Sequence, residues 1–238
     1  MKVSVSVHGR FHGFDLAREL NRYGVLGGLI TTYPRFAVRP HLGAIDSLLT
    51  VPSLELRRRI CQRFNGLCGD IDGRLAQSFA KFAAAHLPPC DLLVGWSSAT
   101  LEAIPVARER GARVVIERGS SHVLHQTNLL KDLHARDNKV FTGTSSLIIE
   151  RELAEYESAD SIAVPSSYAA QTFASHGIPL DKILVNPYGV DLEQFSPTPF
   201  NANKRPKILF VGLVGIRKGV PELLSAFSRL SSDAELCL

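Results

Sequence analysis

The residues best suited to chemistry follow an apolar run, Arg113–Glu117, that is typical of a buried strand. The loop after this run carries Arg118, His122 and His125. An imidazole ring can donate and accept hydrogen bonds, so a histidine at the carboxyl end of a strand suits contact with a sugar hydroxyl or a phosphate. His122 and His125 could ligate a metal if they lay on one helix face, but no third ligand stands at a supporting spacing. We therefore expect no metal site.

A second polar loop, His8–Gly13, follows the first predicted strand, residues 2–7, and precedes a helix predicted over residues 14–23. A strand, a glycine-containing loop and a helix form the first turn of a doubly wound fold, where open α/β sheets place their ligands. The alternative is a glycine-rich turn with exposed histidine and arginine side chains. The loop lacks a GxGxxG fingerprint, which disfavours a nicotinamide cofactor.

A third such loop lies near the end of the chain. Lys207–Val211 is an apolar run that predicts a strand, Gly212 follows it, and the basic pair Arg217 and Lys218 precedes a predicted helix from Val220. Backbone amides and the helix dipole favour an anion at such a turn, and the basic pair adds positive charge. The turn therefore suits a diphosphate, and an ordinary exposed loop is the alternative.

Strands and helices alternate along the rest of the chain. Apolar runs predict strands at residues 26–31, 91–95, 160–164 and 182–186, and helical spacing predicts helices at residues 53–64, 70–86, 99–110, 146–158 and 168–176. This order indicates an α/β fold with a doubly wound, mainly parallel sheet.

Four local expectations accompany this pattern. The alternating V-S-V-S-V of the first strand predicts a position near a sheet edge or one polar face. Residues 33–52, which contain three prolines, are expected to be irregular. Ser166 is expected to begin a helix and to face the cleft. The glutamates of the predicted helix 146–158 are expected to form a solvated face; they are Glu150, Glu152, Glu155 and Glu157.

The composition divides the chain into two expected domains. Residues 1–195 form the first, residues 196–206 form a linker rich in Ser, Pro, Thr and Asn, and residues 207–238 begin a second Rossmann-like unit. This last segment is shorter than the roughly 40 residues below which a domain seldom folds alone. We expect it to be a truncated, weakly stable start of a longer domain, and we expect proteases to cut first in the linker.

The stretch around this boundary resembles glycosyltransferase family 4, which has the GT-B fold. The resemblance rests on PYGVD followed by Phe195, on FVG…RKG at the start of the second unit, and on the upstream SADSIAVPSSYAAQTFASHGIPLDKILVN. These motifs occur in the order that the family has. One departure is Leu213, which stands where the family often has an arginine, so Arg217 is the candidate replacement.

The resemblance implies a function and a set of site residues. The function is transfer of a sugar from a nucleotide-diphosphate sugar to a glycan or lipid-linked acceptor, with retained anomeric configuration and without a metal or other cofactor. His122 would contact the donor sugar as the catalytic residue, and the diphosphate would bind at Gly212, Arg217 and Lys218. The acceptor and cleft contacts would be His8, Gly9, Arg10, His12, Gly13 and Ser166.

Two other functions remain open from the sequence. The chain could be a truncated, non-catalytic α/β binding module that keeps the acceptor domain without turnover. A nucleotide-cofactor oxidoreductase ranks third, because the glycine fingerprint and a following ribose-binding acid are absent.

Composition limits the partners and the location. The chain has 238 residues, a net charge of +4 and a pI near 9.0, which suits an anionic substrate or a lipid surface but falls short of a nucleic-acid footprint. Its start lacks the apolar core of a signal peptide, so we expect a cytoplasmic protein. The four cysteines show no CxxC spacing, and buried free thiols are favoured over disulfides or zinc ligands.

The predicted helix 53–64 has two interpretations. Its arginines, Arg57, Arg58, Arg59 and Arg63, are interleaved with apolar residues. A basic amphipathic helix of this kind can lie on an anionic membrane, which would make the protein peripheral at the inner membrane face. The alternative is a solvated basic face on a helix that packs by its apolar side.

Overall fold

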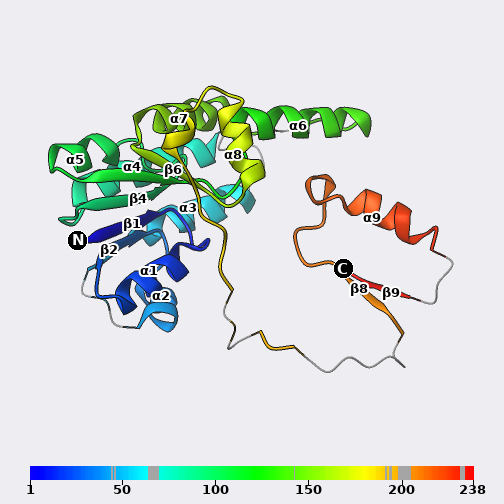
Figure 1. The fold of residues 1–238 in the computed structure, drawn as a ribbon, viewed down its shortest axis with the longest axis horizontal. Helices are drawn as coiled ribbons and strands as arrows, with labels where there is room; N and C mark the ends of the chain where they lie inside the picture. The colour runs from blue at the N-terminus through cyan, green and yellow to red at the C-terminus, as the bar shows by residue number, and fades with distance from the viewer. Residues whose placement is uncertain are drawn as a thin grey trace. The chain divides into compact units, whose positions relative to one another are not determined.

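The fold was obtained as a computed structural model of residues 1–238. The structure describes residues 1–43, 45, 47–63, 70–141, 143–190, 192, 195–197, 205–230 and 234–238. The chain divides into two compact units, residues 1–126 with 144–187 and residues 127–143 with 188–238 (Figure 1).

The first unit contains a seven-stranded parallel sheet. Its strands are β1 (Val3–Val7), β2 (Leu26–Thr31), β3 (Leu48–Thr50), β4 (Leu92–Trp96), β5 (Arg113–Glu117), β6 (Ser161–Val164) and β7 (Ile183–Val185). Their spatial order is β3-β2-β1-β4-β5-β6-β7, and every neighbouring pair is parallel. The order reverses between β1 and β4, which is where doubly wound sheets bind ligands. The predicted α/β fold class is confirmed.

Helices cover both faces of this sheet (Figure 1). They are α1 (Gly13–Arg22), α2 (Arg35–Leu42), α3 (Pro52–Arg63), α4 (Ile71–His86), α5 (Ala103–Glu109), α6 (Val123–Arg136), α7 (Ser146–Ser158) and α8 (Ser167–Ala174). Three of these helices are N-capped by a side-chain oxygen. Asp70 accepts from the Gly73 amide at 3.0 Å and caps α4, and Ser145 and Ser166 cap α7 and α8 in the same way. Such caps satisfy amides that a helix start leaves without partners.

The core has two layers because consecutive strand residues point to opposite faces. Leu29 and Val94 pack with α1 and α2, whereas their neighbours Ile30 and Leu93 pack with the residues of α4, α5, α7 and α8. Both faces are therefore buried, which accounts for the apolar runs that predicted the strands.

Of the two alternatives for the first strand, the edge position is wrong, and the polar face exists but is buried. β1 is the third of seven strands and all five of its residues are buried. Its valines belong to the cluster around α1 and α2, and Ser4 and Ser6 are only 0% and 1% exposed on the other face. The alternation reflects small polar residues inside the protein, so it indicates neither an edge nor a solvated face.

The prediction that residues 33–52 are irregular is also wrong, because α2 and β3 lie within this segment. Pro34 directly precedes α2, and Pro52 is the first residue of α3, where a missing amide hydrogen is tolerated. Pro40 lies inside the short helix α2. Two of the three prolines therefore mark helix starts.

The second unit has a two-stranded parallel sheet, β8 (Lys207–Leu209) and β9 (Glu235–Cys237), with helix α9 (Val220–Phe227) between the strands in sequence. Residues 127–136, which make up most of α6, belong to this unit, and only the first turn of α6 belongs to the first unit. Most of the predicted linker, residues 198–204, lies outside the described residues.

In the part of the chain that the structure describes, none of the helices combines the length and the apolar composition needed to cross a lipid bilayer.

The expectation of free thiols is wrong for Cys61, which is disulfide-bonded, because a missing CxxC spacing does not exclude pairing. Cys90 and Cys237 are free and partly buried, and Cys68 lies outside the described residues.

Candidate functional site

The loops that follow β1, β4, β5 and β6 all leave the sheet at its carboxyl edge. Two of these loops contain a non-glycine residue with a positive φ angle, Phe11 at 38° and Ser98 at 72°. Such backbone conformations are unfavourable for residues with a side chain and concentrate at functional sites. We therefore expect a functional site at this edge of the sheet.

His12 and Glu117 form a hydrogen-bonded pair at this edge. His12 directly precedes α1, Glu117 ends β5, and the distance from His12 Nε2 to Glu117 Oε1 is 3.0 Å. The Glu117 side chain is 5% exposed and that of His12 is 29% exposed. The carboxylate is thus shielded while the imidazole ring stays accessible.

The ring of Trp96 packs against the His12 ring of this pair. Its ring centroid lies 4.8 Å from that of His12, and Trp96 is the register partner of Glu117 in the neighbouring strand, so both side chains leave the same face of the sheet. Gly13 lets α1 begin this close to the sheet, since a Cβ there would lie 3.2 Å from the Trp96 ring and 3.0 Å from Val7. A bulkier residue at position 13 would displace His12.

The pair can act as a base. An ionised carboxylate accepts from Nε2–H, which fixes the tautomer and places the basic lone pair on Nδ1. A carboxylate that orients an imidazole and stabilises its protonated form is a recurring arrangement for removing a proton from a hydroxyl. Among the predicted site residues, His12 is the one that the structure places in such a pair. Glu117 begins the polar loop that the sequence indicated, but no role was predicted for it, although an acid at the end of a predicted strand was a usable signal.

Arg118 follows Glu117 in sequence and donates hydrogen bonds to three groups. It donates to Glu152 Oε1 at 2.8 Å, to Ser97 Oγ at 3.4 Å and to the Ser121 carbonyl at 3.2 Å. Glu152 also accepts from the Tyr156 hydroxyl at 2.6 Å. Burial raises the pKa of Glu152, and the Arg118 charge opposes that shift. This network connects the loops after β4 and β5 to α7.

The prediction of a solvated glutamate face on α7 is wrong for two of its four residues. Glu152 and Glu155 are 3% and 0% exposed, whereas Glu150 and Glu157 are exposed. Glu155 accepts from the backbone amides of Ser98 at 2.6 Å, Thr100 at 2.7 Å and Leu101 at 2.9 Å. Burial raises the pKa of Glu155 to about 8, and the amide hydrogen bonds counteract it. The carboxylate binds the β4–α5 loop, so it is an internal anchor.

His122 lies in an aromatic cluster. Its ring stacks on His176 with centroids 4.2 Å apart and contacts Tyr156 and Phe173 at 5.2 and 5.1 Å. The residue is 2% exposed, its Nδ1 accepts from the Leu124 amide at 3.3 Å, and its own amide donates to Thr172 Oγ1 at 2.9 Å. Burial lowers the pKa of His122 to about 4, and the charges of His176, Arg118 and His125 add to the shift.

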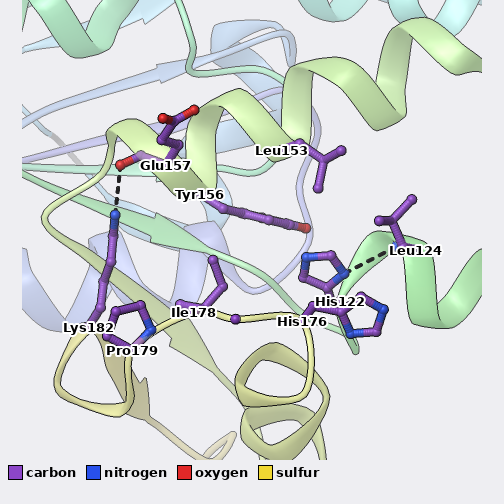
Figure 2. Close-up of a pocket in the computed structure, with 10 residues that line it drawn as sticks. His122, Leu124, Leu153, Tyr156, Glu157, His176, Ile178, Pro179 and Lys182 are labelled. Atoms are coloured by element: carbon purple, nitrogen blue, oxygen red, sulfur yellow. Dashed lines mark hydrogen bonds between the residues drawn. The ribbon is translucent and has the colours of Figure 1, made fainter.

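A cavity of about 320 Å³ opens beside His122 (Figure 2). Residues of α7 and of the segment after α8 form its walls; they include Leu153, Tyr156, His176, Ile178 and Pro179. Lys182 lies at its rim and donates to the Glu157 carbonyl at 2.7 Å. The lining is mainly apolar apart from the stacked histidines.

His8, Gly9 and Arg10, which were also predicted as site residues, precede His12 in the β1–α1 loop. Burial lowers the pKa of His8 to about 4, and the charges of Arg58 and Arg151 lower it further. His8 Nδ1 is buried and has no hydrogen-bond partner among the described residues. The Gly9 carbonyl accepts from Thr31 Oγ1 at 2.8 Å, and Arg10 is exposed.

Ser166 caps a helix of the first unit, and the basic pair belongs to the second unit. The Ser166 hydroxyl accepts from the Ala169 amide at 3.2 Å and so caps α8. Arg217 and Lys218 are exposed on a short 3₁₀ turn of the second unit, followed by Gly219 with a φ of 69°, which begins α9. Gly212 has a φ of 157° in the same unit. In the described parts of the chain, three or more His, Cys, Asp or Glu side chains nowhere gather as a metal ion would require.

No protein-family model matches the chain, and no curated protein matches it in sequence. Solved structures match it in fold. The apo form of the lipopolysaccharide outer core galactosyltransferase WaaB is 14% identical, with a TM-score of 0.52, over 99% of this chain and 60% of that one. LpCGTa, solved in complex with UDP, is 14% identical, with a TM-score of 0.50, over 99% and 69% of the two chains.

The fold is GT-B-like. A UDP-GlcNAc 2-epimerase from Methanocaldococcus jannaschii matches with 15% identity and a TM-score of 0.45 over 78% of this chain and 45% of that one. The chain thus spans roughly half the length of these GT-B-like neighbours, from 45% to 69%. At these identities the likeness concerns the fold, and activity is a matter for proposal.

Proposed function

We propose that this chain carries the acceptor side of a nucleotide-sugar glycosyltransferase of the family 4 type. The observation that carries the proposal is the His12–Glu117 pair at the switch point of a GT-B-like sheet. The resemblance implies that the acceptor is a glycan or a lipid-linked glycan. Such an acceptor has hydroxyl groups that the His12 side chain could contact. A lipid-linked acceptor would bring the protein to a membrane, as the arginine-rich helix α3 also predicts.

The reaction breaks the bond between the sugar and the diphosphate and forms a bond to the acceptor oxygen. His12 Nδ1 would accept a hydrogen bond from the acceptor hydroxyl, and Glu117 would hold the ring in place, while in the retaining route that the resemblance implies the departing diphosphate takes the proton. The negative charge that develops on the diphosphate would be met by Arg217, Lys218 and the amides around Gly212. No nucleophilic side chain is needed for this route.

The resemblance implies retention of configuration without a metal, and product stereochemistry tests this directly. In-line attack by a base-activated hydroxyl inverts the anomeric centre, whereas front-side attack retains it because the departing phosphate takes the proton. Nuclear magnetic resonance of the first-formed product distinguishes the two. An inverted product would instead assign His12 as the general base that takes the acceptor proton.

The catalytic role of His122 stays a prediction. His122 is 2% exposed, so a donor sugar could reach its ring only if neighbouring side chains moved. The side chain of His12 is 29% exposed and needs no such movement. We therefore assign direct contact with the acceptor to His12. A His122→Asn variant with normal donor KM and normal turnover would exclude the donor contact.

The proposal is tested by turnover of purified protein with UDP-glucose, UDP-galactose and UDP-N-acetylglucosamine, read as UDP release. We expect one donor to be used and His12→Ala to lower turnover at least 100-fold, within the range of general-base effects. His86→Gln, at the exposed end of α4, is the matched control and should keep full activity. Donor binding without turnover would favour the non-catalytic module, and neither binding nor turnover would refute the proposal.

A further inference from the structure

A cleft of about 320 Å³ is formed by α2, the loop that follows it and the edge strand β3. Its lining residues are Arg35, Arg39, Gly43, Ile45 and Leu48. Small-molecule pockets in proteins have volumes of about 300–1,000 Å³, so this cleft has room for a small ligand. It shares no residue with the cavity beside His122.

Arg35 and Arg39 place two positive charges on one face of α2. They are four residues apart, which brings their side chains together across one helical turn. Both are exposed, and neither forms an ion pair with a residue that the structure describes. The sequence of α2 contains no acid, and Asp46, the one acid between Arg35 and Leu48, lies outside the described residues. Like charges at this spacing are destabilising, and an oxyanion in the cleft would remove the repulsion.

The backbone of β3 orients one of these arginines. Arg35 Nη2 donates to the Leu48 carbonyl at 3.1 Å, which ties one edge of the guanidinium group to the strand. The donors that remain on Arg35, together with those of Arg39, suit a carboxylate or a phosphate, because a planar guanidinium group binds either one through two parallel hydrogen bonds. Ile45 and Leu48 add an apolar surface on which the carbon face of a sugar ring can lie.

The cleft lies in the strand–helix unit next to the one that carries His12. Thr31 ends β2, and its hydroxyl donates to the Gly9 carbonyl of the β1–α1 loop at 2.8 Å. Helix α2 then begins at Arg35 and packs beside α1 (Figure 1). β3 is two strands from β1, which is a separation of roughly 10 Å. An oligosaccharide spans this separation, so one acceptor can reach both places.

We propose that the acceptor is an anionic glycan and that Arg35 and Arg39 bind an oxyanion on one of its sugars, a carboxylate or a phosphate group. This inference rests on the proposed function, which places the reacting hydroxyl of the acceptor at His12. A concave site favours a glycan over an extended anionic surface such as a membrane or a nucleic acid, because only a ligand that enters the cleft contacts Ile45 and Leu48. The arginine pair thus selects the acceptor.

Calorimetric titration without a donor tests the site apart from sugar transfer. The charged probes are trigalacturonate and galactose 6-phosphate, and their neutral counterparts are the methyl ester and galactose. We expect one charged probe to bind at least about tenfold more tightly than its neutral counterpart, because charge-assisted hydrogen bonds are the strong ones. Arg35→Gln with Arg39→Gln should remove this preference. Arg74→Gln with Arg113→Gln removes two exposed arginines elsewhere and should keep it.

A lysine variant distinguishes a shaped site from diffuse positive charge. Arg35→Lys with Arg39→Lys keeps both charges but loses the planar groups, so we expect it to bind the charged probe at least about threefold more weakly than the native chain. Native affinity in this variant would overturn the proposal, and so would equal affinity of the native chain for charged and neutral probes. Inorganic phosphate that binds as tightly as the charged sugars would also overturn it, because the site would then be one for a free anion.

Transfer kinetics separate this inference from the proposed function. With the charged acceptor, the Arg35→Gln, Arg39→Gln variant should raise the KM for acceptor about tenfold with little change in kcat, because the arginines hold the acceptor equally in the ground state and the transition state. An unchanged KM in an active protein would overturn the inference alone. Arginine-dependent binding without any transfer would support the inference and count against the proposed function.

Discussion

Phe11 combines an exposed aromatic ring with a backbone angle that residues with a side chain seldom adopt. It is 60% exposed, its φ angle is 38°, and it lies one residue before His12. Strain of about 1–3 kcal/mol persists only where the surroundings impose it. An exposed ring beside a base is also a surface on which a sugar can stack. We therefore propose that the backbone strain at Phe11 holds its ring where the acceptor binds.

Replacement of Phe11 by Asn separates these two effects. Asparagine tolerates a positive φ, so we expect equal or higher stability, by up to about 1 kcal/mol. Loss of the ring should raise the KM for acceptor about tenfold with little change in kcat, because stacking contributes to binding in the ground state and the transition state alike. Tyr23→Asn, which removes a ring 80% exposed beyond α1, is the control. An unchanged acceptor KM would show that the Phe11 ring does not contact the acceptor.

The buried histidines should make stability depend on pH. His122 has a folded-state pKa of about 4 against an ordinary value of 6.5, so the unfolded chain binds more protons between these two values. Its stabilising effect is complete above pH 6.5 and is lost as the pH falls toward 4. The contribution lost between pH 7 and pH 5 should be no more than about 2 kcal/mol.

Chemical unfolding at pH 7 and pH 5 measures this loss. A His122→Phe variant keeps an aromatic ring between Tyr156 and Phe173 but cannot titrate, so it should lose less stability on acidification than the native chain. His8 also titrates below its ordinary range and remains in both proteins. Equal losses in the two proteins would mean that His122 is not the group responsible.

At the scale of elements, α7 holds the β4–α5 loop in place through Glu155. Three backbone amides donate to this carboxylate, and one of them belongs to Ser98, whose φ angle is positive. Arg151 adds a second connection, because it donates to the Ser98 carbonyl at 2.8 Å and pairs with Glu102 at 2.6 Å. The loop next to Trp96 is thus shaped by a residue that follows Ser98 by 57 positions, not by its own sequence.

Removal of the Glu155 carboxylate should be strongly destabilising. Glu155→Ala leaves three buried amides without their acceptor, and we expect a loss of about 3 kcal/mol or more in the free energy of unfolding. Glu150→Gln, on the exposed side of the same helix, should change it by less than about 0.5 kcal/mol. Denaturant titration of both variants provides the comparison. A loss below 1 kcal/mol for Glu155→Ala would indicate that water replaces the carboxylate.

Element positions were largely predictable because the parallel sheet is buried on both faces. The six predicted strands occur within about two residues of their predicted ends, since each is a short apolar run between turn residues. β3 and α2 were missed because prolines that begin helices look like breakers. The burial of Glu152 and Glu155 could not be predicted, because the partners that neutralise them come from distant loops. For the same reason the sequence pointed to His12 but not to its bond with Glu117.

At the scale of the whole molecule, the proposal assigns the acceptor contacts to the first unit and the diphosphate contacts to the second. The first unit contains the acceptor-side pair, and the second presents Arg217 and Lys218 before α9. The net charge of +4 is consistent with an anionic donor and an anionic surface, although it specifies neither. Domain boundaries near residues 196–206 stay a prediction, because most of those residues lie outside the described part of the chain.

Donor binding should depend on the basic pair. Arg217→Gln with Lys218→Gln should weaken UDP binding about tenfold or more, since each charge-assisted hydrogen bond contributes roughly 1–3 kcal/mol. Arg229→Gln removes an exposed arginine of the same unit and should have little effect. Isothermal titration calorimetry with UDP measures all three proteins. Equal affinities would place the diphosphate elsewhere.

The central claim is that His12 and Glu117 act as one unit on the acceptor, and a double-mutant cycle of sugar transfer tests it most directly. We expect His12→Ala and Glu117→Gln each to lower kcat about 100-fold or more, and the double variant to be little worse than His12→Ala, because Glu117 acts through the ring. Losses that multiply in the double variant, or full activity in Glu117→Gln, would contradict the account.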